Sequence, residues 1–391
     1  MDVRTAAPAG FYAEDDCDVE DFKTLVASQV VSTDVPNAAR IERNVPIYDV
    51  DDFREGLEHT DTRDGLMAEW ARILLSGAGV FVLKTAFADT TCIDQATQAY
   101  NEIIQKEKQG AGTAADHFAP AGSNDRIWNS LQKLCTEAPE TFVRYFANPA
   151  IDAACEAWLG PNYQMTAQVN LVRPGGQAQE AHRDYHLGFQ TAEKSAQYPV
   201  HVHDLSPLMT LQGGIAHCDM SVESGPTKLL PFSQLYRPGY AAWRRPDFRA
   251  VFEEHYVQLP LEKGDAIFFN PALFHAAGEN RSKDVDRMVN LMQISSAFGR
   301  SLENVDRIGM CKTAFSHLVR TWSSMSTAEF NAILASTAEG YPFPTNLDTD
   351  PPVGGLAPKS QKELLKEAVQ EGADANTFFA KLDALLQRQK A

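Results

Sequence analysis

The sequence predicts a mainly β core with flanking helices, in the form of a barrel or a double-sheet jelly roll. Between residues 160 and 300, short β-rich runs alternate with turn signals such as VRPGG, VESGP and LEKGD. Short strands at this spacing are typical of barrels and layered sheets, whereas β-α-β units place a helix between strands. Helical periodicity precedes and follows this stretch, so we expect helices around the core.

The elements before the β-rich stretch can be placed in chain order. Residues 66–77 (LMAEWARILLSG) predict a short helix that ends at its final glycine. The run GVFVLKTAF then predicts a buried strand, and a helix capped by Thr90 or Thr91 follows it. The preceding 64 residues mix acidic, Pro and β-branched residues without a sustained period, and we expect irregular structure there.

Helices are also predicted after the β-rich stretch. Residues 301–340 are helical in period, and residues 360–389 predict two closing helices broken near Gly372. The Pro/Gly-rich run YPFPTNLDTDPPVGGLAP is expected to link them. We therefore divide the chain into three parts: an acidic, irregular N-terminal extension (1–64), a β domain (65–300) and a C-terminal helical extension (301–391).

Charge and composition narrow the classes of function. The formal net charge is −17, and residues 1–64 hold 16 acidic against 6 basic side chains. Because phosphate contacts need clustered Lys and Arg, this balance argues against nucleic-acid binding. We find no apolar run near the roughly 20 residues of a membrane span and no signal-peptide pattern. The six cysteines form no CxxC pair and are expected to be reduced, mostly buried thiols, so we predict a cytoplasmic protein.

A candidate metal site lies in the segment QEAHRDYH. On a strand, His182 and Asp184 would point to the same face and could share one metal ion. His275, which follows the apolar strand-like run AIFF, could complete the set from a distant strand. Two histidines and one carboxylate with open positions are typical of non-haem iron(II) oxygenases.

Other histidines in the sequence form competing pairs of candidate metal ligands. His217 and Asp219 repeat the same spacing, and they precede His275 at a plausible distance for a triad. His201 and His203 form a third pair, although their flanking Pro and Asp favour a loop. The spacing alone does not decide among them, because a histidine and an acid two residues apart recur by chance.

Two further features would suit a dicarboxylate co-substrate. Arg287 opens the apolar run MVNLMQI, and its planar fork could hold a carboxylate with two charge-assisted hydrogen bonds. Arg281 is nearer to His275, but it lies in the turn GENRSKD, which favours a surface role. In QMTAQVNLV, polar residues alternate with apolar ones, so one face of a strand there would be polar and could form a pocket wall. The polar positions are Gln164, Thr166, Gln168 and Asn170.

Taken together, these motifs resemble the phytanoyl-CoA dioxygenase family. The pattern runs from PGG-x-x-Q-x-x-HRDYH through SVESGPTKLLPFSQLYRPG to GD-x-x-FFN-x-x-x-x-H-x-x-G-x-N-x-S with a later Arg, over residues 75–298. The resemblance implies a cupin-like double-stranded β-helix that uses Fe(II), 2-oxoglutarate and O2. The implied metal ligands are His182, Asp184 and His275, and the implied 2-oxoglutarate contacts are Arg287, Gln164 and Asn170, with Gln168 as a substitute.

The sequence departs from the family pattern at two places. Ala277 stands where the family often has a small hydroxyl residue, which removes one expected hydrogen bond to the co-substrate. The family's usual PGSH is PFSQ here, at residues 231–234, and we expect this change to alter only a turn.

The predicted function is oxidation by a non-haem iron centre. The default reaction is hydroxylation of an unactivated C–H bond, with release of succinate and CO2, and desaturation or ring formation by the same oxidant stays open. No Lys/Arg cluster suits the phosphates of an acyl-CoA, so we expect a smaller, polar or acidic metabolite as substrate. We expect the substrate pocket to be lined by Trp128, Asn129, Tyr185 and His186.

Two other classes stay open from the sequence. The same barrel could be a cupin-type metal-dependent isomerase or hydrolase that does not use 2-oxoglutarate, or a binding scaffold without activity. Arg287 discriminates among them, because an isomerase has no need of a carboxylate clamp at that position. The sequence is compatible with a monomer or a homo-oligomer.

Overall fold

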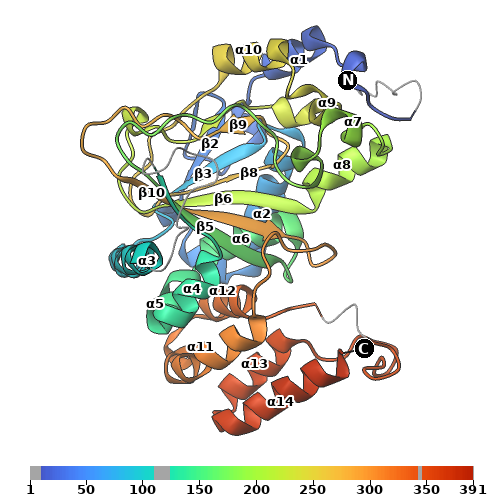
Figure 1. Cartoon of the computed structure of the whole chain (residues 1–391). Coiled ribbons are helices and arrows are strands. Elements are labelled where there is room, and N and C mark those ends of the chain that lie inside the picture. Colours follow the sequence, from blue (N-terminus) through green and yellow to red (C-terminus); the bar gives the residue numbers. More distant parts are fainter. Residues whose placement is uncertain (1–9, 110–123, 342–345, 391) are drawn as a thin grey trace.

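A large mixed sheet forms the centre of the molecule. The computed structural model describes residues 10–109, 124–341 and 346–390 (Figure 1). Within them, eight strands pair in the order β1-β2-β3-β8-β6-β10-β5-β4, and the pair β2–β3 runs parallel while the others run antiparallel. The strands are β1 (Arg40–Glu42), β2 (Val45–Asp49), β3 (Val80–Lys84), β4 (Asn124–Ile127), β5 (Gln164–Val172), β6 (Thr210–Ala216), β8 (Ala266–Phe269) and β10 (Arg287–Ser295).

A smaller second layer faces this sheet. Its strands β7 (Lys228–Leu229) and β9 (His275–Ala276) pair antiparallel, and single bridges add His182 beside β9 and Val257 beside β7. From β5 onward the chain therefore alternates between the layers, which is the winding of a double-stranded β-helix. The predicted jelly-roll core with flanking helices is confirmed, and the large sheet stays open at β1 and β4.

The two faces of the large sheet have different chemistry. On β5, Met165, Ala167, Val169 and Leu171 pack into the main hydrophobic core under the helices. The alternate residues point to the other side, where Gln168 and Asn170 line a cavity between the layers. The strand alternation expected from the sequence thus separates an apolar, helix-covered face from a polar, cavity-lining face.

Helices cover the outer face of the large sheet. Residues of α2, α3, α4, α5 and α6 join one continuous hydrophobic core with that face. As predicted, α2 ends just before Gly77 and α3 begins at Thr91. These helices are α2 (Thr60–Ser76), α3 (Thr91–Gln109), α4 (Ser130–Glu137), α5 (Pro139–Phe146) and α6 (Pro149–Leu159). Shorter helices flank the second layer: α7 (Ala192–Ser195), α8 (Val200–Leu208), α9 (Gly239–Ala242) and α10 (Pro246–His255).

The C-terminal helices extend the same core. Figure 1 shows them gathered beyond α4 and α5, at the end of the molecule opposite α10. Phe315 of α11 and Phe378 of α14 are buried in the main hydrophobic cluster. The predicted break near Gly372 is confirmed between α13 and α14, whereas residues 342–345 of the predicted linker lie outside the described residues. The four helices are α11 (Arg307–Thr321), α12 (Thr327–Thr337), α13 (Gln361–Gln370) and α14 (Ala375–Arg388).

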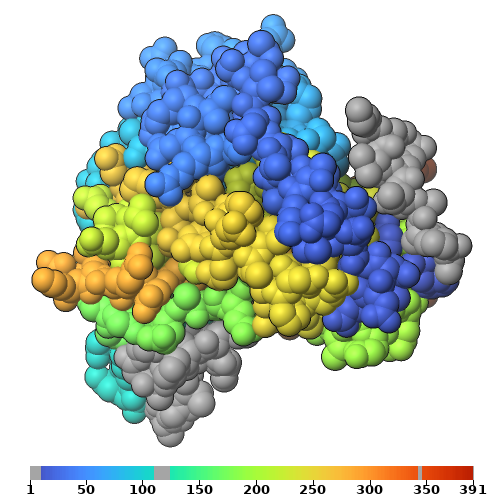
Figure 2. All heavy atoms as spheres, turned by 90° about the horizontal axis from the view of Figure 1, so that it is seen from above, coloured from blue at the N-terminus to red at the C-terminus, as the bar shows by residue number. Residues whose placement is uncertain are grey.

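The N-terminal segment differs from the irregular structure predicted for residues 1–64. Its strand β2 is buried and pairs parallel with β3, so residues 45–49 belong to the large sheet. A five-residue strand is too short to show a sustained period, which is why the sequence pattern missed it. Helix α1 (Val19–Val26) packs Phe22 against Phe248 of α10, and Figure 2 shows this dark blue segment lying on the yellow one. The boundaries of the three predicted parts stay a prediction.

Two predictions about the chain as a whole can be compared with the structure. All six cysteines lie in described residues, form no disulfide, and four of them are buried. None of the described helices is both long enough and apolar enough to cross a membrane. The cytoplasmic location stays a prediction.

Candidate active site

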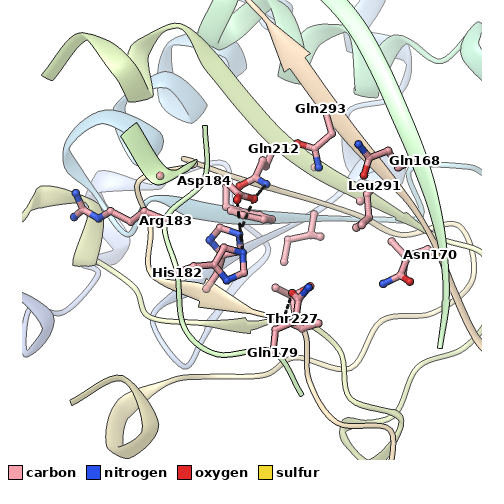
Figure 3. Close-up of a pocket in the computed structure, with 18 of the residues that line it drawn as sticks. Gln168, Asn170, Gln179, His182, Arg183, Asp184, Gln212, Thr227, Leu291 and Gln293 are labelled. Carbon is pink, nitrogen blue, oxygen red and sulfur yellow. Dashed lines mark hydrogen bonds and ion pairs between the residues drawn. The ribbon is translucent and has the colours of Figure 1, made fainter. Parts of the chain in front are cut away.

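A cavity of about 760 Å³ lies between the two layers of the β core. Its walls come from the inner faces of β5, β6, β8 and β10 and from the second layer around residues 179–185 and 275–277. Figure 3 shows polar side chains from both layers pointing into it. The cavity therefore gathers polar groups from both layers in one space.

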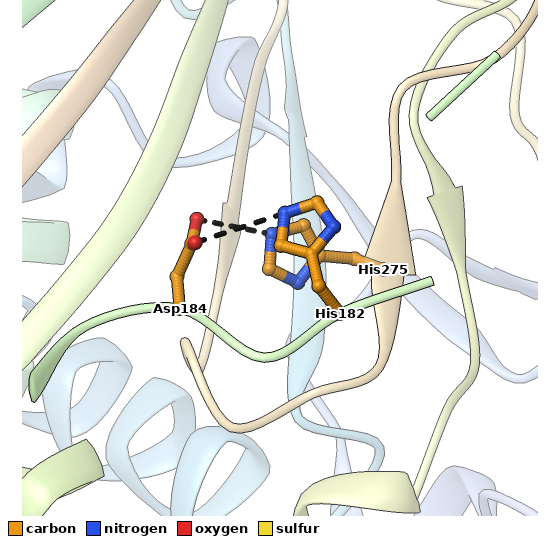
Figure 4. A group of neighbouring side chains, drawn as sticks. All are labelled: His182, Asp184 and His275. Atoms are coloured by element: carbon orange, nitrogen blue, oxygen red, sulfur yellow. Dashed lines mark ion pairs between the residues drawn. The ribbon is translucent and has the colours of Figure 1, made fainter. Parts of the chain in front are cut away.

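His182, Asp184 and His275 meet at one wall of this cavity. His182 and His275 face each other across the second layer, joined by two backbone hydrogen bonds of 3.0 and 3.1 Å. The Asp184 carboxylate lies 3.7 Å from Nε2 of His182 and 3.4 Å from Nε2 of His275 (Figure 4). Ligands about 2.1 Å from one metal ion lie roughly 3 Å apart when their bonds are at right angles. The three side chains thus converge as a metal site requires.

The hydrogen bonds of both histidines leave their Nε2 atoms available. Nδ1 of His182 donates to the Glu180 carbonyl at 2.9 Å, and Nδ1 of His275 donates to the Leu273 carbonyl at 2.8 Å. A carbonyl can only accept, so each Nδ1 carries a proton, and Nε2 is the nitrogen left to bind a metal ion. Burial, together with neighbouring His275, lowers the pKa of His182, which keeps its imidazole neutral at pH 7.

Asp184 is held as a carboxylate. Nε2 of Gln212, on β6, donates a 2.5 Å hydrogen bond to its Oδ2. Burial alone would raise the pKa of Asp184, but the two nearby imidazoles and Gln212 outweigh burial and hold the pKa well below its ordinary value. Two imidazoles and one carboxylate suit a divalent transition metal, and three ligands leave positions open for other molecules.

A buried arginine lines the same cavity. Arg287 begins β10 and is 4% exposed, and its Nη1 donates to the carbonyls of Ser224 at 3.3 Å and Gly278 at 3.1 Å. Burial lowers its pKa to about 10, so the guanidinium stays charged at neutral pH. Among the described residues no carboxylate forms an ion pair with it. A desolvated cation of this kind is costly unless an anion enters the cavity.

Comparison with known proteins identifies the family. The family model for phytanoyl-CoA dioxygenase (PhyH) matches residues 75–289, which is more than half of the chain. The chain belongs to the phytanoyl-CoA dioxygenase family. It is accordingly an enzyme of the iron- and 2-oxoglutarate-dependent oxygenase superfamily and uses iron, 2-oxoglutarate and O2. The predicted family and cofactors are thereby confirmed.

Named relatives are similar over part of the chain. "Dioxygenase trt7" of Aspergillus terreus is 28% identical over 229 residues, covering 58% of this chain and 72% of that protein. "Dioxygenase andF" of Emericella variicolor is 26% identical over 144 residues, covering 36% of this chain and 45% of that protein. Among solved structures, the epimerase SnoN in complex with Fe3+, alpha ketoglutarate and nogalamycin RO is 17% identical, with a TM-score of 0.41, and covers 60% of this chain and 85% of that one.

Of the three amide residues predicted to contact the co-substrate of this dioxygenase, two line the cavity and one does not. Gln168 and Asn170 line the cavity, and Oε1 of Gln168 accepts a 3.0 Å hydrogen bond from Arg126. Gln164 is not among the lining residues. Its Nε2 instead donates to the carbonyls of Ser296 and Gly299, at 2.7 and 2.8 Å. Gln164 therefore fastens the loop after β10, and the prediction of a co-substrate contact does not fit its position.

The four predicted substrate residues divide in the same way. Trp128 and Tyr185 line the cavity of the dioxygenase, but Asn129 and His186 do not. Asn129 has a left-handed backbone (φ 53) and binds Gln132 through its side chain. His186 is exposed, and its Nδ1 lies 3.1 Å from the Ser206 hydroxyl. A turn at each of these positions rotates the side chain away from the cavity.

The competing histidine pairs lie elsewhere in the dioxygenase. His217 is buried beneath the helices, where its two ring nitrogens lie 2.8 Å from the hydroxyls of Thr97 and Tyr145. Burial lowers the pKa of His217 to about 3, and Asp219 accepts from the backbone of Lys263.

The remaining alternatives do not line the cavity either. His203 is buried with Nε2 3.1 Å from the Ser195 carbonyl, while His201 is exposed. Arg281 is also exposed, in the turn where a surface role was expected. In the described residues, the one group of His, Cys, Asp and Glu that could hold a metal is His182, Asp184 and His275.

Sequence reasoning missed several residues that line the cavity, among them Gln212, Gln293 and Glu303. Gln212 and Gln293 face each other across β6 and β10 and line the cavity, as does Glu303 in the loop before α11. The period of β10 could have identified Gln293, because it lies on the same face as Arg287, six residues earlier. Gln212 and Glu303 carry no comparable signal, since their positions depend on how distant segments pack.

Proposed function

We propose that this enzyme hydroxylates an unactivated C–H bond of a small polar molecule bound in the cavity. His182, Asp184 and His275 would hold the iron, and Arg287 would bind the distal carboxylate of 2-oxoglutarate. In the balanced reaction, one oxygen atom of O2 enters the substrate and the other enters succinate, and CO2 leaves. The observation that carries the proposal is the convergence on one cavity of this donor set and a buried arginine that has no acidic partner among the described residues.

Arg287 favours an oxygenase over the alternative metal-dependent isomerase or hydrolase. Its charge is buried in the described structure without an acidic partner, so the site is prepared for a molecule that carries its own negative charge. Hydrogen bonds to Ser224 and Gly278 fix one arm of the fork and hold the guanidinium in place. A co-substrate carboxylate would complete this buried ion pair.

The hydroxyl that the family often has after the distal histidine can be supplied from the neighbouring strand. Lys228 pairs with Ala276, and continuing this antiparallel register places Thr227 opposite Ala277. Both residues line the cavity. We infer that Thr227 replaces the missing hydroxyl, so the substitution at Ala277 does not remove a hydrogen-bond donor from the site.

When bound, iron and 2-oxoglutarate supply the oxidising chemistry, and the protein supplies position and shielding. The backbone pair between His182 and His275 fixes both imidazoles, and Gln212 fixes the carboxylate of Asp184. Apolar side chains from β8 and β10, including Phe269 and Val289, line the cavity beside them. These surfaces exclude water and keep a bound substrate from moving.

The test is whether the purified protein forms succinate. Iron(II)-loaded protein would be mixed with 2-oxoglutarate and O2, with and without candidate polar metabolites, and succinate would be followed together with hydroxylated product. We expect succinate from the wild-type protein and none above background from His182→Ala. Equal succinate from the two proteins would remove the proposal, and succinate without an oxygenated product would exclude hydroxylation for that metabolite.

A further inference from the structure

The cavity extends along β10 from Arg287 to Gln293. Arg287, Val289, Leu291 and Gln293 all line it, because alternate residues of β10 point to one face. Six residues of strand span about 20 Å. The four C–C bonds of 2-oxoglutarate extend at most about 6 Å, so a molecule bound to Arg287 fills only part of this span. The rest of the cavity, toward Gln293, is left for another molecule.

Gln293 is a polar residue of this region whose side chain has no partner among the described residues. It is 8% exposed, and among the described residues its amide makes no hydrogen bond. Gln212, directly opposite on β6, already uses its Nε2 to bind Asp184. Figure 3 shows the Gln293 amide near Gln212, directed into the cavity. A ligand that displaces water from this amide must replace its hydrogen bonds or lose affinity.

The neighbouring side chains extend the polar surface. Gln168 lies diagonally across from Gln293 on β5, and the Arg126 guanidinium binds its oxygen, which orients the amide. Tyr185 is 3% exposed, lines the cavity, and its hydroxyl has no partner. The Tyr185 backbone (φ 63, ψ 155) lies in a region that residues other than glycine rarely adopt, and such strain is typical of functional sites. Amide and hydroxyl groups therefore dominate this end of the cavity.

The charges near this end offset one another. Burial raises the pKa of Glu303, and the hydrogen bond from the Asn129 backbone and the nearby charges of Lys133 and Arg126 oppose this rise. A charged ligand group would find no unmatched counter-ion here, in contrast to the Arg287 end. A plain hydrocarbon would leave the Gln293 amide without hydrogen bonds. A neutral polar group satisfies both conditions.

We propose that Gln293 is a substrate-recognition residue, and that the primary substrate presents to it a neutral group with a hydrogen-bond donor beside an acceptor. A carboxamide, a lactam or an imide has this arrangement and matches a glutamine amide on both of its atoms. The inference rests on the proposed function, because it assigns the Arg287 end of the cavity to 2-oxoglutarate. It specifies the substrate class as an amide-bearing molecule and not an alkyl chain.

Two probes of equal shape test the proposal. Cyclohexanecarboxamide carries a donor and an acceptor, whereas cyclohexyl methyl ketone carries the acceptor alone. Their affinities would be measured by anaerobic calorimetry on the protein saturated with iron(II) and 2-oxoglutarate. We expect about tenfold tighter binding of the carboxamide, which is the effect of one buried hydrogen bond. Equal affinities, or no measurable binding of either probe, would overturn the proposal.

Matched variants locate the effect. Gln293→Met keeps the side-chain length but removes the amide, so the preference for the carboxamide should disappear. Gln164→Leu removes an amide from the same sheet outside the cavity, and the tenfold preference should persist. Loss of the preference in both variants, or retention in both, counts against Gln293, and a thermal unfolding curve shows that each variant is folded.

The same protein samples separate this inference from the proposed function. Absence of succinate with the carboxamide preference intact would reject the oxygenase reaction and keep the recognition site. Succinate formation without the preference would reject the recognition site and keep the reaction.

Discussion

The histidine-x-aspartate motif at residues 182–184 recurs at residues 217–219, and the structure uses these two copies differently. His182 and Asp184 turn into the cavity, and both His182 and His275 bind backbone carbonyls through Nδ1 alone. His217 uses both ring nitrogens within the core, while Asp219 turns outward to Lys263. Strand β6 ends at Ala216, so the period of two no longer applies at His217. A histidine can bind metal only where its surroundings leave one nitrogen free.

Replacing the aspartate of each motif by alanine should give the largest difference in iron binding between two matched variants. Asp184→Ala removes the single anionic ligand of the candidate site. Losing a residue that only hydrogen-bonds to a metal ligand costs about 10- to 100-fold in metal affinity, so losing a ligand itself should cost more than about 100-fold and abolish succinate formation. Asp219→Ala should keep iron, because Asp219 is bound only to the Lys263 backbone in the described structure. Iron content after gel filtration would measure both, and iron retention by Asp184→Ala would contradict the assignment.

The two arginines near His275 sharpen the comparison further. Arg287→Met removes a buried charge from the cavity and should weaken 2-oxoglutarate binding by about 2–4 kcal/mol, or roughly 30- to 1000-fold. Arg281→Met changes an exposed side chain and should leave that affinity within a factor of about two. Anaerobic calorimetry with 2-oxoglutarate would measure both variants. If the Arg281 variant loses affinity and the Arg287 variant does not, the clamp has been placed at the wrong residue.

The sequence predicted the parts of the site that depend on local geometry. The alternation in β5 put Gln168 and Asn170 on the cavity face, as expected for a strand. The metal-ligand motif and the distal histidine came together because the fold pairs His182 with His275 directly. These features need only the period of a strand and the order of the strands.

The sequence wrongly assigned some residues to the cavity, because their positions depend on geometry beyond the local strand pattern. Alternation assigns Gln164 to the correct face, but it does not tell how far along β5 the cavity extends. Asn129 and His186 occupy backbone turns with positive φ, where the side chain no longer follows the strand direction. Gln212 reaches the site through its contact with Asp184, which no local pattern encodes.

The second motif should affect stability where the first affects metal binding. His217→Leu removes two hydrogen bonds and leaves the hydroxyls of Thr97 and Tyr145 buried without their partner. We expect the free energy of unfolding to fall by about 2 kcal/mol at pH 7, with metal content unchanged. Urea unfolding of the iron-free protein would measure this. Loss of bound iron without loss of stability would mean that His217 is a ligand.

The effect of His217 should also depend on pH, and this is the smallest of the expected differences. Burial depresses its pKa to about 3, while in the unfolded chain it is about 6.5. Its contribution is therefore complete above pH 6.5 and is lost as the pH falls toward 3, because only the unfolded chain then takes up the proton. The gap between wild type and His217→Leu should narrow by up to about 1.4 kcal/mol per pH unit and close near about pH 5. The other titrating groups are the same in both proteins, so their effects cancel in the difference. Parallel curves of unfolding free energy against pH would show that His217 takes up its proton in the folded protein as well.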